Sequence, residues 1–376
     1  MYYRTMVLAQ QGVEIDFLTY GEGQDVDLPG VRIIRIPRFG FLGKVSVGPS
    51  YLKLFLDVFM VLWTLALLIR HRYDFVHAHE EAVFYAAMLK PIFRFKMIYD
   101  MHSSLPQQLS NFKFTKSKFL IGLFTRLEDY SLRKANAVIT ICPDLANYAT
   151  GRIEDQEKHF LIENSIFEPV RLAGSAAASG DEQPVTLPAG RKIVVYAGTL
   201  EPYQGVDILV KSFAKVFAAQ PDALLLIVGG TAEQVQRHKD IAQEAGVAEQ
   251  VVFTGRVSQR LAKQYCAMAA VQTSPRSAGT NTPLKVYEQL ASGIPLVATR
   301  IYSHTQVLTD DVAYLVEPNP DDMARGVLAA LGDGAGGNTR AARAREVYET
   351  KYSRPVYEGK IRRLLERIKT CAASRA

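Results

Sequence analysis

The sequence predicts an α/β protein of two domains, each built on a parallel sheet. Short runs rich in β-branched residues alternate with longer stretches of helical periodicity, and this alternation occurs twice. A segment at 173–190, rich in Ala, Ser, Gly and Pro and without periodicity, separates the two series. At 376 residues the chain also exceeds what one hydrophobic core usually organises.

In the first series, the apolar runs are bounded by turn residues and are short enough to be strands. The expected strands are 13–19, 31–36, 75–78, 96–100, 137–141 and 160–162, and the expected helices are 51–70, 80–90, 117–134 and 143–150. The second series repeats this pattern. Its expected strands are 192–197, 224–228, 251–254, 271–273, 295–299 and 313–316, with helices at 205–219, 231–245, 258–268, 283–292, 303–308 and 320–331.

The last amphipathic stretch, 354–369, is basic and is expected to form a terminal helix that packs across the junction of the domains. The sequence therefore predicts a first domain at 1–172, a linker at 173–190, a second domain at 191–352 and a C-terminal helix within 353–376. In open α/β sheets ligands bind beyond the carboxyl ends of the strands, so two facing sheets would enclose a cleft.

Composition excludes several classes of protein. With 48% hydrophobic and 22% charged residues the chain is not disordered. Its three cysteines, Cys142, Cys266 and Cys371, form no C-x-x-C pair, which favours a reducing compartment over a disulfide framework or a zinc site. Because no secretory signal precedes the first periodic segment, we expect a cytoplasmic protein.

The first half of the chain carries a basic excess, with sixteen Lys or Arg against seven Asp or Glu between Leu28 and Lys134. Its most apolar stretch, 54–69, contains Asp57 and is shorter than the roughly 20 residues that span a bilayer, so it is interpreted as a buried or interfacial helix. Basic and apolar residues alternate at 112–120. This pattern predicts peripheral attachment to the anionic inner membrane face, with a solvated helix end as the alternative. Nucleic acid is not expected as a partner, because no aromatic-rich recognition motif is found.

Three short motifs suggest chemistry that their context does not support. Gly332, Gly334 and Gly337 match G-x-G-x-x-G but follow a helix and enter a polar stretch, which is expected to be a surface connection and not a dinucleotide site. His77, His79, Glu80 and Glu81 resemble a metal cluster, but Val83 stands where H-E-x-x-H needs histidine. The acidic D-x-D at 25–27 is expected to be a solvated turn. No metal or other cofactor is therefore predicted.

The most informative window is 273–300, TSPRSAGTNTPLKVYEQLASGIPLVATR. A strand ends near Thr273, a loop of small polar residues follows, and Pro283 has the fixed φ that suits the first turn of a helix. Free backbone N–H groups and the helix dipole favour phosphate there, and Lys285 adds a cation. Glu288 lies more than one turn further, within reach of ribose hydroxyls. The pattern predicts a nucleotide diphosphate site, and an exposed amphipathic helix is the alternative.

At this window the chain resembles the retaining glycosyltransferases of family 4, which have the GT-B fold of two facing Rossmann-like domains with a cleft between them. The resemblance extends over nearly the whole chain. It includes YDFVHAH at 73–79, IYDMHSS at 98–104, YAGTLEPYQGVDILVKSF at 196–213, VVFTGRVS at 251–258 and YEQLASGIPLVAT at 287–299. It implies transfer of a sugar, with retention of configuration, from a nucleotide sugar to a hydroxyl of a glycan or lipid-linked acceptor. Enzymes of this kind often need no metal.

Site residues carry over from the resemblance only where the residues match. Glu288 matches the family's second carboxylate, which holds the ribose, but the first carboxylate is replaced by Thr280. Where the family places Arg and Lys against the donor phosphates, this chain has Thr199 and Gln204, and Arg276 and Lys285 are expected to substitute for them. His102 is expected to line the pocket for the donor sugar and the acceptor. We therefore expect catalytic roles for His102, Thr280 and Lys285. The expected donor-binding residues are Gly198, Thr199, Gln204, Gly255, Arg256, Val257, Arg276, Asn281, Thr282, Pro283, Leu284 and Glu288.

Two rival functions share this pattern. An epimerase of the same fold would bind a nucleotide sugar without an acceptor, and a non-catalytic binding protein would explain Thr199, Gln204 and Thr280. The first twenty residues resemble the end of the family's first helix followed by its second strand. The family's first strand and glycine-rich loop are not recognised, so a protein beginning at Met1 is expected to be poorly active or unstable.

Overall fold

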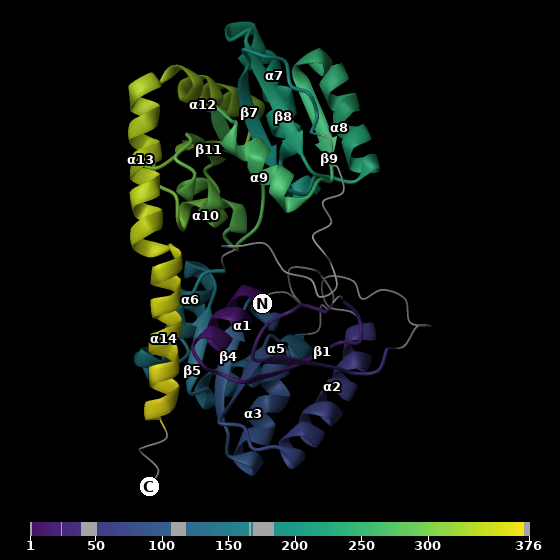
Figure 1. The fold of residues 1–376 in the computed structure, drawn as a ribbon, viewed down its shortest axis with the longest axis vertical. Coiled ribbons are helices and arrows are strands. Elements are labelled where there is room, and N and C mark those ends of the chain that lie inside the picture. The colour runs from purple at the N-terminus through teal and green to yellow at the C-terminus, as the bar shows by residue number, and fades with distance from the viewer. Residues whose placement is uncertain are drawn as a thin grey trace. The chain divides into compact units, whose positions relative to one another are not determined.

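The computed structural model describes residues 2–23, 25–38, 51–106, 118–164, 167 and 184–371. The chain divides into two compact units, shown in Figure 1. Unit 1 contains the described residues up to Asn164 together with those from Tyr357 onward, and unit 2 contains Phe167 and residues 184–356. The predicted linker lies outside the described residues as far as 183.

Unit 1 contains six strands and the helices between them in the part of the chain that is described. The strands are β1 (Ile15–Thr19), β2 (Val31–Arg35), β3 (Phe75–His79), β4 (Lys96–Met101), β5 (Ala137–Thr140) and β6 (His159–Leu161). The helices are α1 (Tyr2–Gln10), α2 (Tyr51–Arg70), α3 (Ala82–Phe93), α5 (Lys118–Lys134), α6 (Pro143–Thr150) and the 3-10 turn η2 (Gln156–Lys158). Each strand lies where the sequence predicts one, with ends that differ by one or two residues.

The strands of unit 1 form two parallel sheets. β3, β4, β5 and β6 pair in that order, while β1 pairs with β2, and no pairing joins β1 or β2 to β3 among the described residues. Side chains alternate across β4, so Met97, Tyr99 and Met101 join a core with α3, α5 and α6. Asp100 therefore points to the opposite face, where Arg4 of α1 meets it.

Helix α2 covers Tyr51–Arg70, as the sequence predicts. Its segment Leu52–Arg70 is, however, long and apolar enough to cross a membrane by length and composition, which the sequence interpretation of 54–69 did not expect. Only 11% of the most apolar part of this helix is buried. The helix is therefore not buried, and the interfacial alternative remains. Asp57 faces the protein, where the hydroxyl of Tyr20 donates to its Oδ1 over 2.7 Å.

Unit 2 is a single parallel sheet of six strands with helices on both faces (Figure 1). The strands are β7 (Lys192–Ala197), β8 (Ala223–Val228), β9 (Val251–Gly255), β10 (Val271–Ser274), β11 (Leu296–Thr299) and β12 (Tyr314–Val316). The helices are η3 (Pro202–Gln204), α7 (Val206–Ala219), α8 (Ala232–Glu244), η4 (Ala248–Gln250), α9 (Gln259–Ala267), α10 (Leu284–Ala291), α11 (Tyr302–Thr305), α12 (Pro320–Gly332) and α13 (Gly334–Lys351).

Side chains alternate along the strands of unit 2 and so pack on both faces of the sheet. Val194 and Tyr196 of β7 face α7, α8 and α12, whereas Ile193 and Val195 face α9. The strand order is β12-β11-β10-β7-β8-β9, so the direction of winding reverses between β7 and β10. In doubly wound sheets this reversal opens a crevice at the carboxyl ends of the strands, which makes the loops after β7 and β10 the expected ligand-binding loops.

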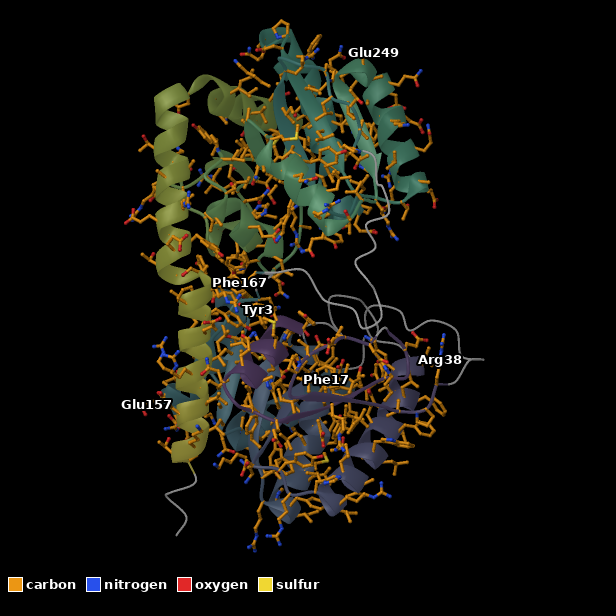
Figure 2. All side chains as sticks on the ribbon, viewed as in Figure 1. Tyr3, Phe17, Arg38, Glu157, Phe167 and Glu249 are labelled. Carbon is orange, nitrogen blue, oxygen red and sulfur yellow. The ribbon has the colours of Figure 1, made fainter. Side chains whose placement is uncertain are left out.

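Two further elements lie near the C-terminus. The glycines at 332, 334 and 337 were expected in a surface connection, but α13 begins at Gly334, so that expectation is wrong. Helix α14 (Arg354–Thr370) contributes its residues from Tyr357 onward to unit 1. There Tyr3 and Tyr357 bring their ring centroids within 5.4 Å, and Lys360 forms an ion pair of 2.6 Å with Glu163. Tyr3 is labelled in Figure 2.

Candidate functional site

The loops at the carboxyl ends of β7, β8 and β10 interlock closely. Gly229 has φ +115°, and a Cβ at this position would lie 2.1 Å from the carbonyl oxygen of Gly198. Gly205 has φ +65°, and a Cβ there would lie 2.0 Å from the carbonyl oxygen of Pro275. Only glycine combines this backbone with such close approach. The two contacts bring the loop at 198–205 against the loops that follow β8 and β10.

Helix α10 begins at this junction, as the sequence predicts, but one residue later. Pro283 has φ −64° and ψ +135°, so it precedes the helix and is not part of its first turn. Lys285 is the second helical residue and Glu288 the fifth. Asn281 and Thr282 lie in the loop before Pro283 and Leu284 opens the helix, so the predicted donor-binding residues 281–284 do surround the N-terminus of α10.

Lys285 turns from α10 toward the loop after β7. Its Nζ lies 4.1 Å from the ring centroid of Tyr196 and 3.5 Å from Oε1 of Gln204. A Cβ built on Gly198 would lie 3.7 Å from the same Nζ. The ammonium group therefore lies beside the loop that contains Gly198, Thr199 and Gln204. The family resemblance implies that the cations which bind the donor phosphates lie in this loop.

The pKa of Lys285 is lowered to about 7, first by burial and then by the positive charge of Arg276. Arg276 itself is bound within its own loop, since Nε donates to the carbonyl oxygen of Ala278 over 2.6 Å and Nη1 to that of Asn281 over 3.3 Å. Burial lowers the pKa of this guanidinium too. Because the two positive charges repel each other, a bound anion would stabilise both of them.

Glu288 and Thr280 occupy different surroundings. The Glu288 carboxylate is about half exposed and pairs loosely with Lys263, at 3.8 Å. Burial nevertheless raises its pKa, against the opposing effect of Lys263. Thr280 is exposed, and its carbonyl oxygen accepts a hydrogen bond from Gln306. Because a threonine hydroxyl carries no charge, Thr280 does not replace the carboxylate that the resemblance expects there.

A pocket of about 480 Å³ opens beside this site, at the ends of β8 and β9. Its lining includes Gly255 and Arg256, two of the three residues that the resemblance assigns to the nucleotide base. The full lining is Gly230, Thr231, Ala232, Val235, Phe253, Thr254, Gly255 and Arg256. Sequence reasoning missed Phe253 and Val235, whose apolar side chains suit a flat base. The sequence did contain one sign of this pocket, the glycine pair Gly229-Gly230 directly before the capping box of α8.

The remaining predicted residue, His102, belongs to unit 1. It follows β4, and its Nε2 lies 3.2 Å from Oδ1 of Asp100. Asp100 has no exposed side-chain surface and forms an ion pair with Arg4. Burial by itself would raise the pKa of this carboxyl, but Arg4 and the histidines around it outweigh burial and hold the pKa well below its usual range. The ion pair of Arg4 with Asp100 was not predicted, because the sequence around a single arginine on a short helix does not indicate which residue it contacts.

The strand order and crossovers of unit 2 define an α/β unit of the doubly wound type. Comparison with known proteins covers both units. The family described as glycosyl transferases group 1 matches residues 180–350, and the glycosyl transferase 4-like domain matches residues 7–165. The chain belongs to the group 1, family 4-like glycosyltransferases of the GT-B fold, as the sequence resemblance predicts.

Individual relatives agree with this assignment. An uncharacterized glycosyltransferase of Methanocaldococcus jannaschii is 24% identical over 87% of this chain and 82% of its own length. The D-inositol 3-phosphate glycosyltransferase of Nocardiopsis dassonvillei is 25% identical over 98% of this chain and 88% of its own length. Among solved structures, sucrose-phosphate synthase from Thermosynechococcus elongatus matches with a TM-score of 0.72 and 21% identity, over 98% of this chain and 92% of its own. Anabaena HepE in complex with UDP and glucose matches with a TM-score of 0.64 and 17% identity, over 94% of this chain and 99% of its own.

Proposed function

We propose that the protein transfers a sugar from a nucleotide diphosphate sugar to a hydroxyl of a glycan or lipid-linked acceptor, with retention of configuration. The observation that carries this proposal is the position of Lys285 beside the loop at 198–204. Together with the N-terminus of α10, it would offer a diphosphate one ammonium group and the positive end of a helix dipole. Stabilising the charge of the departing diphosphate would be the main contribution to rate.

The other donor contacts follow from the same placement. The nucleotide base would enter the pocket lined by Phe253, Gly255 and Arg256, and Glu288 would accept hydrogen bonds from the ribose hydroxyls. Structural neighbours support a nucleotide donor, because Anabaena HepE was solved in complex with UDP and glucose. We propose that the donor phosphates need no metal here, since Lys285 and Arg276 supply the positive charge. UDP binding in unit 2 should then be the same with EDTA as with Mg²⁺.

Glu288 gives this proposal a specific test. Replacing Glu288 by glutamine is expected to weaken UDP binding about tenfold, because a hydrogen bond to a charged acceptor contributes about 1.5–3 kcal/mol. The variant should also distinguish UDP from 2′,3′-dideoxy-UDP less strongly, because its amide oxygen is a weaker acceptor, and calorimetry with both ligands measures this. Glu249→Gln is a matched control, since Glu249 lies in η4, before β9, and so at the other end of that strand from Gly255 (Figure 2). Undiminished discrimination in Glu288→Gln would contradict the assignment of the ribose.

A non-catalytic nucleotide-binding protein is the second candidate, favoured by the uncharged Thr280. It would bind UDP equally well but would consume no donor sugar. An epimerase would convert a nucleotide sugar in the absence of any acceptor. Nuclear magnetic resonance spectra of UDP-glucose and GDP-mannose, incubated with the enzyme alone and then with a lipid extract, separate the three functions.

The acceptor side is proposed to attach peripherally to the cytoplasmic membrane face, in the synthesis of a cell-surface polysaccharide or glycolipid. Leu54, Val58 and Leu62 of α2 are each more than half exposed, as are Met88 and Ile92 of α3. Lys53 and Arg70 flank the apolar surface of α2. One relative is named for a lipid acceptor: the phosphatidyl-myo-inositol mannosyltransferase of Mycobacterium tuberculosis. It is 31% identical over 39% of this chain and 38% of its own length. Phe112, Lys113, Phe114 and Lys116 lie outside the described residues.

The triple substitution Leu54→Gln, Val58→Gln and Leu62→Gln is expected to reduce sedimentation with phosphatidylglycerol vesicles about tenfold or more, because each large apolar side chain contributes about 1.5–3 kcal/mol when buried. Reversing the charges of Lys113, Lys116 and Lys118 should reduce it as well. Met268→Gln removes a comparably exposed apolar side chain from unit 2 and is the control. Equal sedimentation of the triple variant and the control would contradict the proposed membrane attachment.

A further inference from the structure

Strands β3 and β4 place three potential metal ligands on one face of the sheet in unit 1. Their register pairs His79 with Asp100 and His77 with Ile98. Side chains two residues apart on a strand share a face, so His77 and His79 lie together on the side opposite Ala78, which packs into the core. Asp100 points to the same side as His79. This arrangement could not be read from the sequence, in which Asp100 lies more than twenty residues from His79.

The three side chains converge on a single point. Nε2 of His77 and Nε2 of His79 each lie 2.9 Å from the same oxygen, Oδ2 of Asp100. All three ligand atoms lie within 4.8 Å of one another. The two imidazole rings stack, with centroids 5.2 Å apart and planes inclined by 11°. Both rings keep some exposed surface, at 16% and 21%, whereas the carboxylate has none. Solvent therefore reaches the cluster from the histidine side.

The surroundings hold these ligands in place. Arg4 binds the other carboxylate oxygen, Oδ1, and donates to the carbonyl oxygen of Ile162 over 2.9 Å, so Oδ2 remains directed at the histidines. A side chain that fixes a ligand from behind in this way tunes many metal sites. His102 and His79 bring their ring centroids within 4.9 Å.

We propose that His77, His79 and Asp100 bind a divalent transition-metal cation of the zinc class, through Nε2, Nε2 and Oδ2. Two imidazoles and one carboxylate suit Zn²⁺, Co²⁺ or Ni²⁺ better than Mg²⁺ or Ca²⁺, which prefer oxygen ligands. Binding would move the proton of each imidazole from Nε2 to Nδ1, so two hydrogen bonds to Asp100 are exchanged for coordination without net loss of protons. Three protein ligands leave a position for water or a substrate oxygen.

This inference does not depend on the proposed function, because it is tested without nucleotide or sugar. The full chain, dialysed against EDTA and then against metal-free buffer, is titrated with zinc chloride in a calorimeter. We expect one site per chain of micromolar affinity or tighter in the wild type. His79→Gln should weaken the affinity at least about tenfold, while its amide can still donate to Asp100 and so preserve the fold. His77→Gln is a second variant with the same expectation, and circular dichroism verifies that each variant is folded.

The control is His71→Gln, an exposed histidine of unit 1 that lies outside the cluster. Titration with cobalt chloride gives an independent readout, because ligation by these residues produces visible absorption bands that His79→Gln should lose and His71→Gln should keep. Absence of saturable zinc binding would overturn the proposal, as would wild-type affinity in both cluster variants. Either result would leave the donor site of unit 2 unaffected, since UDP binding is measured separately.

Discussion

Replacing Lys285 by methionine is expected to weaken UDP or GDP binding by about 10- to 100-fold, because a charged hydrogen bond contributes about 1.5–3 kcal/mol. The loss in sugar transfer should be larger, about 100- to 1,000-fold, as expected when a donor that stabilises the leaving charge is removed. The reason is local, because Lys285 Nζ lies 3.5 Å from Oε1 of Gln204 and contacts Tyr196, at the loop where the sequence resemblance implies phosphate-binding cations. Calorimetry measures the first effect, and donor turnover measures the second.

The pH dependence of binding adds a second measurement on the same residue. Since the pKa of Lys285 is lowered to about 7, the free enzyme loses this charge above pH 7 and must take up a proton to bind diphosphate. Affinity for UDP should therefore fall between pH 7.5 and 9, approaching about tenfold per pH unit for a single proton. Lys285→Arg keeps its charge over this range, so its pH profile should be flat.

Matched variants separate a phosphate contact from a structural role. Lys215→Met removes an exposed lysine that pairs with Asp321, and its UDP affinity should equal that of the wild type. Gln204→Lys, introduced into Lys285→Met, returns an ammonium group to the position that the family uses and should restore much of the affinity. A folded Lys285→Met variant with wild-type affinity for UDP would show that the diphosphate does not bind at this loop.

Replacing Arg4 by methionine is expected to lower the free energy of unfolding of unit 1 by about 3–5 kcal/mol, because it leaves Asp100 charged and buried without its main partner. The Arg4 and Asp100 side chains are 4% and 0% exposed. Arg4 also donates to Ile162, and its Nε donates to the hydroxyl of Tyr357 over 3.3 Å, so the substitution loosens α14 as well. Urea unfolding followed by circular dichroism measures the change.

The exposed ion pair of Arg32 with Asp16 is the comparison, since Arg32 is 60% exposed and such pairs contribute about 1 kcal/mol or less. Arg32→Met should therefore unfold at nearly the wild-type urea concentration. Where Arg4→Met does not fold, Asp100→Asn should show a loss of the same sign, because it leaves the buried Arg4 without its counter-charge. Equal stabilities of Arg4→Met and Arg32→Met would contradict the structural role assigned to the buried pair.

Much of the fold and part of the site could be predicted from sequence. The runs at 192–197 and 224–228 are short, continuous and apolar, as strands buried on both faces must be, so β7 and β8 were predicted nearly to the residue. Helix α13 was missed because its glycines indicate a loop, whereas Ala344, Val347 and Tyr348 pack in one core with α10. Helix α2 was predicted over 51–70, but the sequence left open whether it is buried or interfacial, because an apolar run does not show what packs against it.

The sequence by itself determined the α/β alternation, the family and the position of Lys285 and Glu288 on one helix, because these depend on neighbours along the chain. Only the tertiary structure decided which distant groups meet. Lys285 reaches Gln204 across two loops, and His77 and His79 of β3 and Arg4 of α1 meet at Asp100 of β4. Such contacts depend on strand register and on close approach at glycines, and neither leaves a pattern at any fixed spacing in the chain.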